Sequence, residues 1–121
     1  MGQKFEFCLE ESCINDMQKY ALSRSLLHNE WCDVIYKARL ETQNLGSLGR
    51  LYHSEKIAEF DTRQIWKLRK GQWRMLLLVK GDVSVVYGIG FWHSSEEKTH
   101  QEIMEEHAKV LETYLGIKYK V

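Results

Sequence analysis

Two arginines flank a short turn in the second half of the chain. Arg69 closes one strand-like segment, Lys70-Gly71-Gln72 turns the chain, and Arg74 opens the next segment. The two side chains are therefore expected at adjacent strand ends, near one edge of a sheet. A guanidinium group binds phosphate through two parallel hydrogen bonds and stabilises the negative charge of a pentavalent phosphorus. The pair predicts a phosphate site, and a solvated or ion-paired strand residue is the alternative for each arginine.

His93 is the histidine best placed for proton transfer. It follows the third strand-like segment and lies beside Trp92 and the pair Ser94-Ser95. Imidazole changes its charge near neutral pH, so it serves as general acid or base in many active sites. We interpret His93 as a candidate for that role, with an exposed loop histidine as the alternative. His107 falls on the apolar stripe of a helix and is expected in the core. The other histidines are expected on the surface: His28, His53 and His100.

Further basic and aromatic side chains accompany the arginines. Lys67 shares the face of Arg69 by strand alternation, and Lys56 approaches from the preceding segment. Residues 50–80 hold eight basic and three acidic side chains, an excess of five positive charges in a chain whose formal net charge is zero. Such an excess is typical of a surface that binds a phosphate backbone, although a solvated face is equally expected. Indole rings stack on bases but more often pack in cores, and two are candidates here: Trp73 and Trp92.

Composition bounds the class of protein. The 121 residues are interpreted as one domain, residues 1–121, because 44% hydrophobic and 28% charged residues suit a globular chain of this length. No segment approaches the ~20 apolar residues of a spanning helix, so no membrane partner is expected. No HExxH, GxSxG or Gly-rich phosphate loop is present, and neither a metal nor another cofactor is expected. Three cysteines without a CxxC pair favour a reducing, cytoplasmic location over a disulfide framework or zinc site: Cys8, Cys13 and Cys32.

Alternating hydrophobicity predicts the strands. A short N-terminal strand is expected at residues 4–9, and three antiparallel strands are expected at residues 65–69, 74–79 and 83–91. Gly88 and Gly90 in the last of these indicate a bulge or a close approach to the backbone. Residues 47–61 lack a clear period, so they are interpreted as a loop or a poorly formed strand.

Helical spacing predicts the remaining elements. Two helices, at about residues 12–27 and 29–45, form a helical hairpin, and Thr99 with Glu102 is a capping box at the start of a C-terminal helix. Gly116 is expected at the end of that helix. The fold predicted is α+β: an N-terminal strand and helical hairpin, then a three-stranded antiparallel sheet and one C-terminal helix, with the helices on one side of the sheet.

Two stretches resemble a known family. They are "IWKLRKGQWRMLLLVKGDVSVVYGIGFWHSS", residues 65–95, and "LGSLGRLYHSEKIAEF", residues 45–60. In order and spacing they are similar to the RelE/ParE superfamily of toxins from type II toxin–antitoxin systems, within it to the HigB-like, phage-derived branch. In that branch one strand ends in arginine, the next opens with arginine, and a third leads through a basic phrase into a helix. The resemblance covers roughly residues 45–115 and implies a RelE-like fold.

The resemblance also implies a function. Active members are ribosome-dependent mRNA endonucleases that activate a ribose 2′-hydroxyl without a metal, and a cognate antitoxin holds them inactive. It implies Arg69 and Arg74 as phosphate binders and His93 as general acid or base. Where the branch carries two lysines, this sequence has His93-Ser94, and it has His100 where the branch often has proline. Contacts to mRNA are expected from further side chains: Lys56, Lys67, Lys70, Trp92 and Lys98.

Two other functions remain open at this point. A ParE-like member keeps the arginine pair but binds a protein target such as gyrase. A non-catalytic accessory protein uses the sheet only to bind a partner. The formal net charge of zero favours these alternatives, because toxins of the family that act on the ribosome are usually basic. The sequence sets neither the oligomeric state nor the sequence that would be cut.

Overall fold

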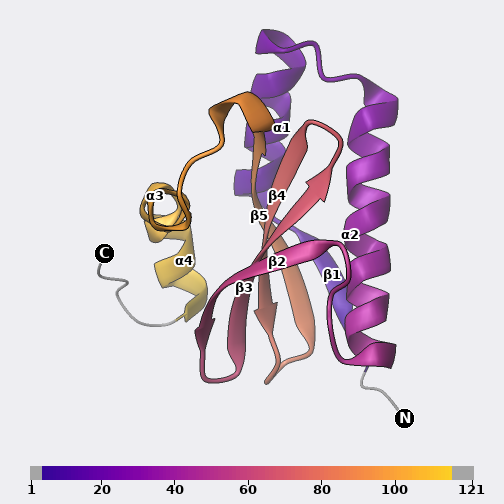
Figure 1. Ribbon diagram of the computed structural model, residues 1–121, viewed down its shortest axis with the longest axis vertical. Helices are drawn as coiled ribbons and strands as arrows, with labels where there is room; N and C mark the ends of the chain where they lie inside the picture. The colour runs from indigo at the N-terminus through magenta and orange to yellow at the C-terminus, as the bar shows by residue number, and fades with distance from the viewer. Residues whose placement is uncertain (1–3, 116–121) are drawn as a thin grey trace.

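Figure 1 shows the computed structural model, which describes residues 4–115 as a mixed β-sheet with helices around it. The elements in chain order are β1 (Glu6–Leu9), α1 (Glu11–Ser23), α2 (His28–Leu48), β2 (Ser54–Phe60), β3 (Arg63–Lys70), β4 (Trp73–Lys80), β5 (Val85–His93), the 3-10 turn η1 (Ser94–Glu96), α3 (His100–Glu106) and α4 (Ala108–Leu115). The strands lie in the order β1-β5-β4-β3-β2. None of the helices within residues 4–115 is long and apolar enough to cross a membrane.

Strand β4 is the centre of the sheet. Its residues from Met75 to Val79 are buried, as its almost unbroken apolar sequence predicts for a strand covered on both faces. It pairs antiparallel with β3 and with β5 along its whole length. The three antiparallel strands expected from the sequence are therefore confirmed.

The three-stranded sheet expected from the sequence is wrong, because two further strands join it. β1 pairs in parallel with β5, from Glu6 opposite Val85 to Leu9 opposite Gly88. β2 pairs antiparallel with β3 and occupies part of the segment interpreted as a loop or a poorly formed strand. The partners of β1 lie about 80 positions further along the chain, so no local pattern reveals that pairing. The α+β class stands, with a five-stranded mixed sheet among residues 4–115.

Helices cover both faces of the sheet, whereas the sequence predicted one. Tyr20 of α1 packs its ring against Trp73 and Phe91, with centroids 5.6 and 6.1 Å apart. His107 packs on Gly90, whose neighbour Phe91 points the opposite way because side chains alternate along a strand. Figure 1 shows α2 on one side of the sheet and α3 with α4 on the other. The site described below lies on the α3 side.

The C-terminal helix begins at the capping box of Thr99 and Glu102, as expected, but it is interrupted at His107. The His107 N–H donates to the carbonyl of Ile103 at 3.2 Å, and Nδ1 of the same residue lies 2.9 Å from that oxygen. The imidazole of His107 occupies the space above Gly90 in which the Cβ of any other residue at position 90 would stand. The single helix of the sequence prediction is therefore two helices, α3 and α4. Gly116, its expected cap, lies outside the described residues.

Strand β5 bulges where its glycines lie, which confirms that expectation. Leu76 pairs with Gly90 and Leu77 with Gly88, so one extra residue, Ile89, stands in β5. Beyond the end of β1, helix α1 covers the free edge of β5. The Ser12 hydroxyl donates to the Ile89 carbonyl at 2.7 Å, and the Asp16 carboxylate accepts from the Phe91 N–H at 3.1 Å. Side chains of a helix thus replace a neighbouring strand.

A fully buried carboxylate fixes the start of β2. Glu41 of α2 is 0% exposed and accepts three hydrogen bonds from consecutive residues at the start of that strand. The donors are the Tyr52 N–H at 3.1 Å, the His53 N–H at 2.9 Å and the Ser54 hydroxyl at 2.8 Å. A buried carboxylate is tolerated when its lone pairs are satisfied in this way. Glu41 therefore holds the edge strand β2 against α2.

We expect Glu41→Ala to lower the free energy of unfolding by about 2–3 kcal/mol, because it leaves three donors without their acceptor. Glu41→Gln keeps one acceptor oxygen in the same place and should cost less, about 1–2 kcal/mol. Urea denaturation measures both, with Glu11→Ala on the exposed start of α1 as the control. A loss no larger than that of the control would contradict this role for Glu41.

Candidate functional site

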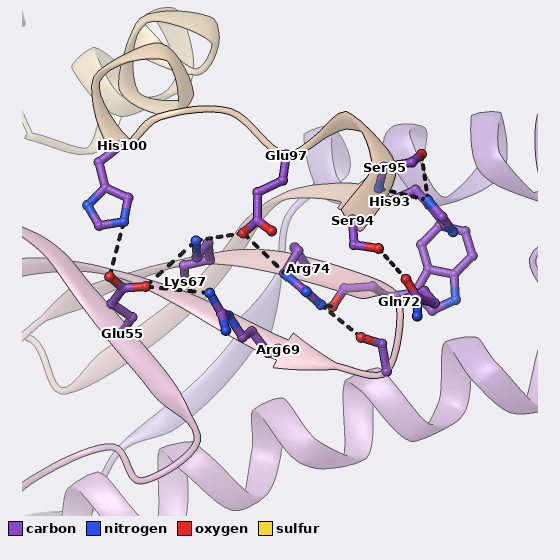
Figure 2. Close-up of polar contacts among 12 residues, drawn as sticks. Glu55, Lys67, Arg69, Gln72, Arg74, His93, Ser94, Ser95, Glu97 and His100 are labelled. Atoms are coloured by element: carbon purple, nitrogen blue, oxygen red, sulfur yellow. Dashed lines mark hydrogen bonds and ion pairs between the residues drawn. The ribbon is translucent and has the colours of Figure 1, made fainter.

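The register of β3 and β4 brings three cationic side chains together on one face of the sheet. Arg69 lies directly opposite Arg74, and Lys67 lies two residues before Arg69 on the same face. The alternation expected from the sequence, with Trp66 and Leu68 on the other face, agrees with this register. Figure 2 shows the three side chains on the same side of the strands. We call Lys67, Arg69 and Arg74 the cationic cluster.

Two carboxylates from other segments approach the cationic cluster. Glu97, between η1 and α3, places one oxygen 2.6 Å from Lys67 Nζ and 3.5 Å from Arg74 Nε. Glu55, on β2, lies 3.7 Å from Lys67 Nζ and 4.0 Å from Arg69 Nη2. Figure 2 shows Glu97 above Lys67 and Arg74, with Glu55 on the far side of Lys67. The cluster is therefore largely charge-compensated within the fold.

The three cations differ in exposure. The Lys67 side chain is 5% exposed, that of Arg74 is 11% exposed, and that of Arg69 is 58% exposed. Arg74 Nη1 donates to the carbonyls of Gly71 and Trp73, each at 2.9 Å, which fixes the guanidinium over the β3–β4 turn. Its buried Nε has no hydrogen-bond partner among residues 4–115, since the nearby Glu97 oxygen is an ion-pair contact only. Arg69 is thus the accessible cation, and Arg74 is the fixed one.

The carboxylate of Glu97 is held in its charged form. The hydrogen bond from Lys67 lowers its pKa from the ordinary value of 4.5, and the charges of Lys67, Arg74 and Arg69 lower it further. Partial burial acts in the opposite direction. Since Glu97 faces two cations, it occupies the position that any other anion would take at Arg74.

A histidine that the sequence placed on the surface joins this site. His100, the first residue of α3, has Nε2 3.2 Å from the Glu55 carboxylate, and its side chain is 43% exposed. The other oxygen of Glu55 faces Lys67 and Arg69. One carboxylate therefore links His100 to the cationic cluster, as Figure 2 shows.

His93 lies apart from the arginines. It pairs with Trp73, whereas Arg74 pairs with Trp92, so the His93 side chain points to the opposite face of the sheet. Its ring meets that of Trp73 edge-on at 5.0 Å, and Nδ1 lies 2.8 Å from the Ser95 hydroxyl. Beside it, Ser94 and Gln72 are hydrogen-bonded. The structure does not bring the histidine expected for proton transfer to the cationic cluster.

Two of the lysines expected to contact mRNA lie on the opposite face of the sheet, the face on which the hairpin of α1 and α2 packs. Lys56 pairs with Trp66, lies 5.9 Å above its ring and forms an ion pair with Glu59 at 3.2 Å. Lys70 pairs with Trp73 at the end of β3, again on the face opposite Arg74. Neither contacts the cationic cluster, because strand alternation turns both side chains to the opposite face of the sheet.

The two remaining candidates lie on the α3 side. Trp92 shares the face of Arg74 but is 8% exposed and packs beside the ring of His107 at 6.0 Å. Lys98 forms an ion pair with Glu106 at 3.0 Å, along α3 and away from the cluster. Of the residues expected to bind RNA, only Lys67 adjoins both arginines through shared ion pairs.

Sequence reasoning missed Glu55, Glu97 and His100. Glu55 belongs to a segment without a clear period, and Glu97 and His100 lie in a connection whose path depends on tertiary packing. The one available sign was His100, which replaces a proline that is common in the resembling branch. No group of three or more metal-ligating side chains occurs within the described part of the chain.

The arrangement of strands and helices matches that of a known class of small proteins. A chain of the archaeal RelE–RelB complex from Pyrococcus horikoshii OT3 has a similar structure, with a TM-score of 0.56 and 11% sequence identity. The similarity covers 78% of this chain and 100% of that chain. No protein-family model matches the sequence, and no curated protein has a significantly similar sequence. The similarity is therefore one of fold, and the fold is RelE-like.

We expect Glu97→Gln to lower the free energy of unfolding at pH 7 by about 1–3 kcal/mol, because it leaves Lys67 buried without its nearest carboxylate. The folded pKa of Glu97 lies below the ordinary 4.5, so its stabilisation is complete above that pH and is lost as the pH falls through the folded pKa. The difference between wild type and variant in urea denaturation should therefore shrink as the pH falls below 4.5. Glu105→Gln, on the exposed side of α3, is the control. A pH-independent difference would refute the ion-pair origin.

Proposed function

We propose that this protein is the toxin of a type II toxin–antitoxin system, a member of the HigB-like branch that cuts mRNA on the ribosome. The observation that carries the proposal is the pair of arginines directly opposite each other at the ends of β3 and β4 on a RelE-like sheet. Two guanidinium groups in this position suit a phosphodiester, which carries one negative charge and gains another in its transition state.

Each residue of the cationic cluster has a separate part in binding a phosphate of the RNA. Arg69 is the exposed cation, so a phosphate of the RNA backbone meets it first. Arg74 is held by two backbone carbonyls and offers a buried Nε–H without a hydrogen-bond partner in the described structure. Phosphate accepts from such preorganised donors without reorganising them. Lys67, buried below, adds positive charge without contacting the RNA.

The reaction proposed is attack of a ribose 2′-hydroxyl on the adjacent phosphorus, with charge stabilised by side chains and without a metal. RNA phosphate competes with Glu97 and Glu55 for the same cations, which makes binding sensitive to salt. The resemblance assigns proton transfer to His93, whose ring lies on the other face of the sheet. The proposed function does not depend on that assignment.

The same proposal includes a cytoplasmic location and a cognate antitoxin as partner. The relative of similar structure was solved as a RelE–RelB complex, which supports a protein partner for this fold. An antitoxin that inhibits cleavage must cover Arg69 or prevent the chain from entering the ribosome.

A second function, binding of a protein target such as gyrase or another partner without RNA cleavage, is favoured by one observation. Glu55 and Glu97 compensate the charge of the cationic cluster, and the chain has a formal net charge of zero. Cations whose charge is already compensated attract an RNA backbone less strongly than a basic surface does, which favours a protein as the target.

We expect the protein to cut a reporter mRNA in a purified translation system only when ribosomes are present, with the cuts mapped by primer extension. Arg69→Ala should slow cleavage by about 100-fold or more, and Arg74→Ala at least as much, because each removes a donor to the transition-state charge. Arg69 is exposed, so its loss should leave thermal stability unchanged.

Arg39→Ala, an exposed arginine on α2, is the matched control and should cut like wild type. Full activity of both Arg69→Ala and Arg74→Ala would show that mRNA cleavage does not take place at the cationic cluster. Intact mRNA with undisturbed translation would favour the second function, and DNA-damage signalling in cells would then indicate gyrase as its target.

A further inference from the structure

We propose that His100, oriented by Glu55, is the general base that removes the proton from the 2′-hydroxyl. This inference rests on the proposed RNA cleavage. Three observations carry it: the face on which His100 lies, the ion-pair contact of its Nε2 with Glu55, and the second ring nitrogen that this contact leaves free.

His100 lies on the face of the arginines. Its Nε2 and the Arg69 guanidinium contact opposite oxygens of the same Glu55 carboxylate, at 3.2 and 4.0 Å. Arg69 and His100 are therefore linked through a single side chain, that of Glu55. Of the five histidines in the chain, His100 is the one with a described contact to a residue of this site.

The contact with Glu55 defines which nitrogen is available. A carboxylate accepts hydrogen bonds only, so Nε2 carries the proton and the lone pair of the neutral ring lies on Nδ1. No partner of Nδ1 is found among residues 4–115, and Figure 2 shows this nitrogen pointing away from Glu55. A base oriented by a carboxylate through its second nitrogen is the arrangement that general-base catalysis requires.

His93 lacks these features. Its Nδ1 lies 3.1 Å from the Ser95 N–H as well as 2.8 Å from the Ser95 hydroxyl, so that nitrogen accepts hydrogen bonds within its own turn. Its ring packs edge-on against Trp73, on the face opposite Arg74. Of these two histidines, His100 is the one that lies on the face of the arginines.

In the proposed step a proton moves to His100, and one phosphorus–oxygen bond forms while another breaks. The 2′-hydroxyl proton passes to His100 Nδ1, and the 2′-oxygen forms a bond to phosphorus. The bond from phosphorus to the 5′-oxygen breaks, and that oxygen takes a proton from water; the hydroxide formed is neutralised by the proton that His100 releases, which regenerates the base. The products are a 2′,3′-cyclic phosphate and a 5′-hydroxyl. Glu55 is a positioning residue that stabilises the imidazolium formed.

The test is chemical rescue. His100→Ala should slow ribosome-dependent cleavage of the reporter mRNA by about 10²–10⁴-fold, the usual contribution of a general base. Added imidazole should restore part of that activity, because the site of the missing ring is open to solvent. Imidazole should not restore Arg69→Ala, which lacks a phosphate donor rather than a base. His28→Ala is the matched control, since His28 is also an exposed histidine at the first residue of a helix.

Glu55→Gln supplies a second readout. It should lower kcat, because the ring loses its charged partner, and lower KM, because a carboxylate that competes with phosphate is gone. A residue that acts only on folding would not lower both together. The thermal stability of each variant, measured alongside, separates loss of fold from loss of chemistry.

The outcomes decide between the inference and the function on which it rests. Loss of cleavage in His100→Ala with rescue by imidazole supports the inference. Full activity of His100→Ala, or loss confined to His93→Ala, overturns the inference and leaves the nuclease standing. Loss in His100→Ala without rescue, at unchanged KM and lowered thermal stability, assigns His100 a structural role and also overturns it. No cleavage by the wild type overturns both.

Discussion

Arg69 and Arg74 lie directly opposite each other on β3 and β4, and the whole site depends on this register. Like charges in that position destabilise an antiparallel pair. The strands cannot slip by one residue to separate them, because a slip would turn the buried Leu68 of β3 to the other face of the sheet and take the buried Lys67 away from Glu97. The core therefore fixes the arginines in place, and negative charge has to be supplied to them from elsewhere.

That negative charge comes from two segments with anchors of their own. Glu55 follows the three residues that Glu41 of α2 binds at the start of β2. Glu97 lies between the 3-10 turn η1 and the capping box of Thr99, so its backbone is held on both sides. The site is thus assembled from β2, β3, β4 and the connection to α3. The charge of the cationic cluster is compensated locally by these two carboxylates, and Arg69 still stays accessible in a chain whose formal net charge is zero.

The parts of the fold that local periodicity encodes were predictable. The apolar run of β4, the alternation of β3 and the helical stripes of the hairpin each show a period of their own. The strand β1 was expected, but its place in the sheet was not, because its partner β5 is distant in the chain. The segment of β2 was left open between a loop and a poorly formed strand, because an edge strand with exposed Glu55 and Lys56 lacks a regular apolar period. For the site, alternation placed Lys67 and Arg69 on one face, and the short turn placed Arg74 at the adjacent strand end, as the register shows. It could not supply Glu97 or His100, whose positions depend on how the connection after η1 crosses the sheet.

The hydrogen bonds of Ser12 and Asp16 to β5 have a consequence for assembly. An uncovered strand edge is a template on which other chains polymerise. Here one edge is occupied by α1 from Ile89 onward, while the other, β2, bears a bulge between Lys56 and Ala58 and charged side chains. Any extended peptide that adds to β5 beyond Gly88 must first displace a helix. A helix therefore blocks β5 beyond Gly88, and the bulge and charges of β2 disfavour pairing at the other edge, which opposes fibril formation.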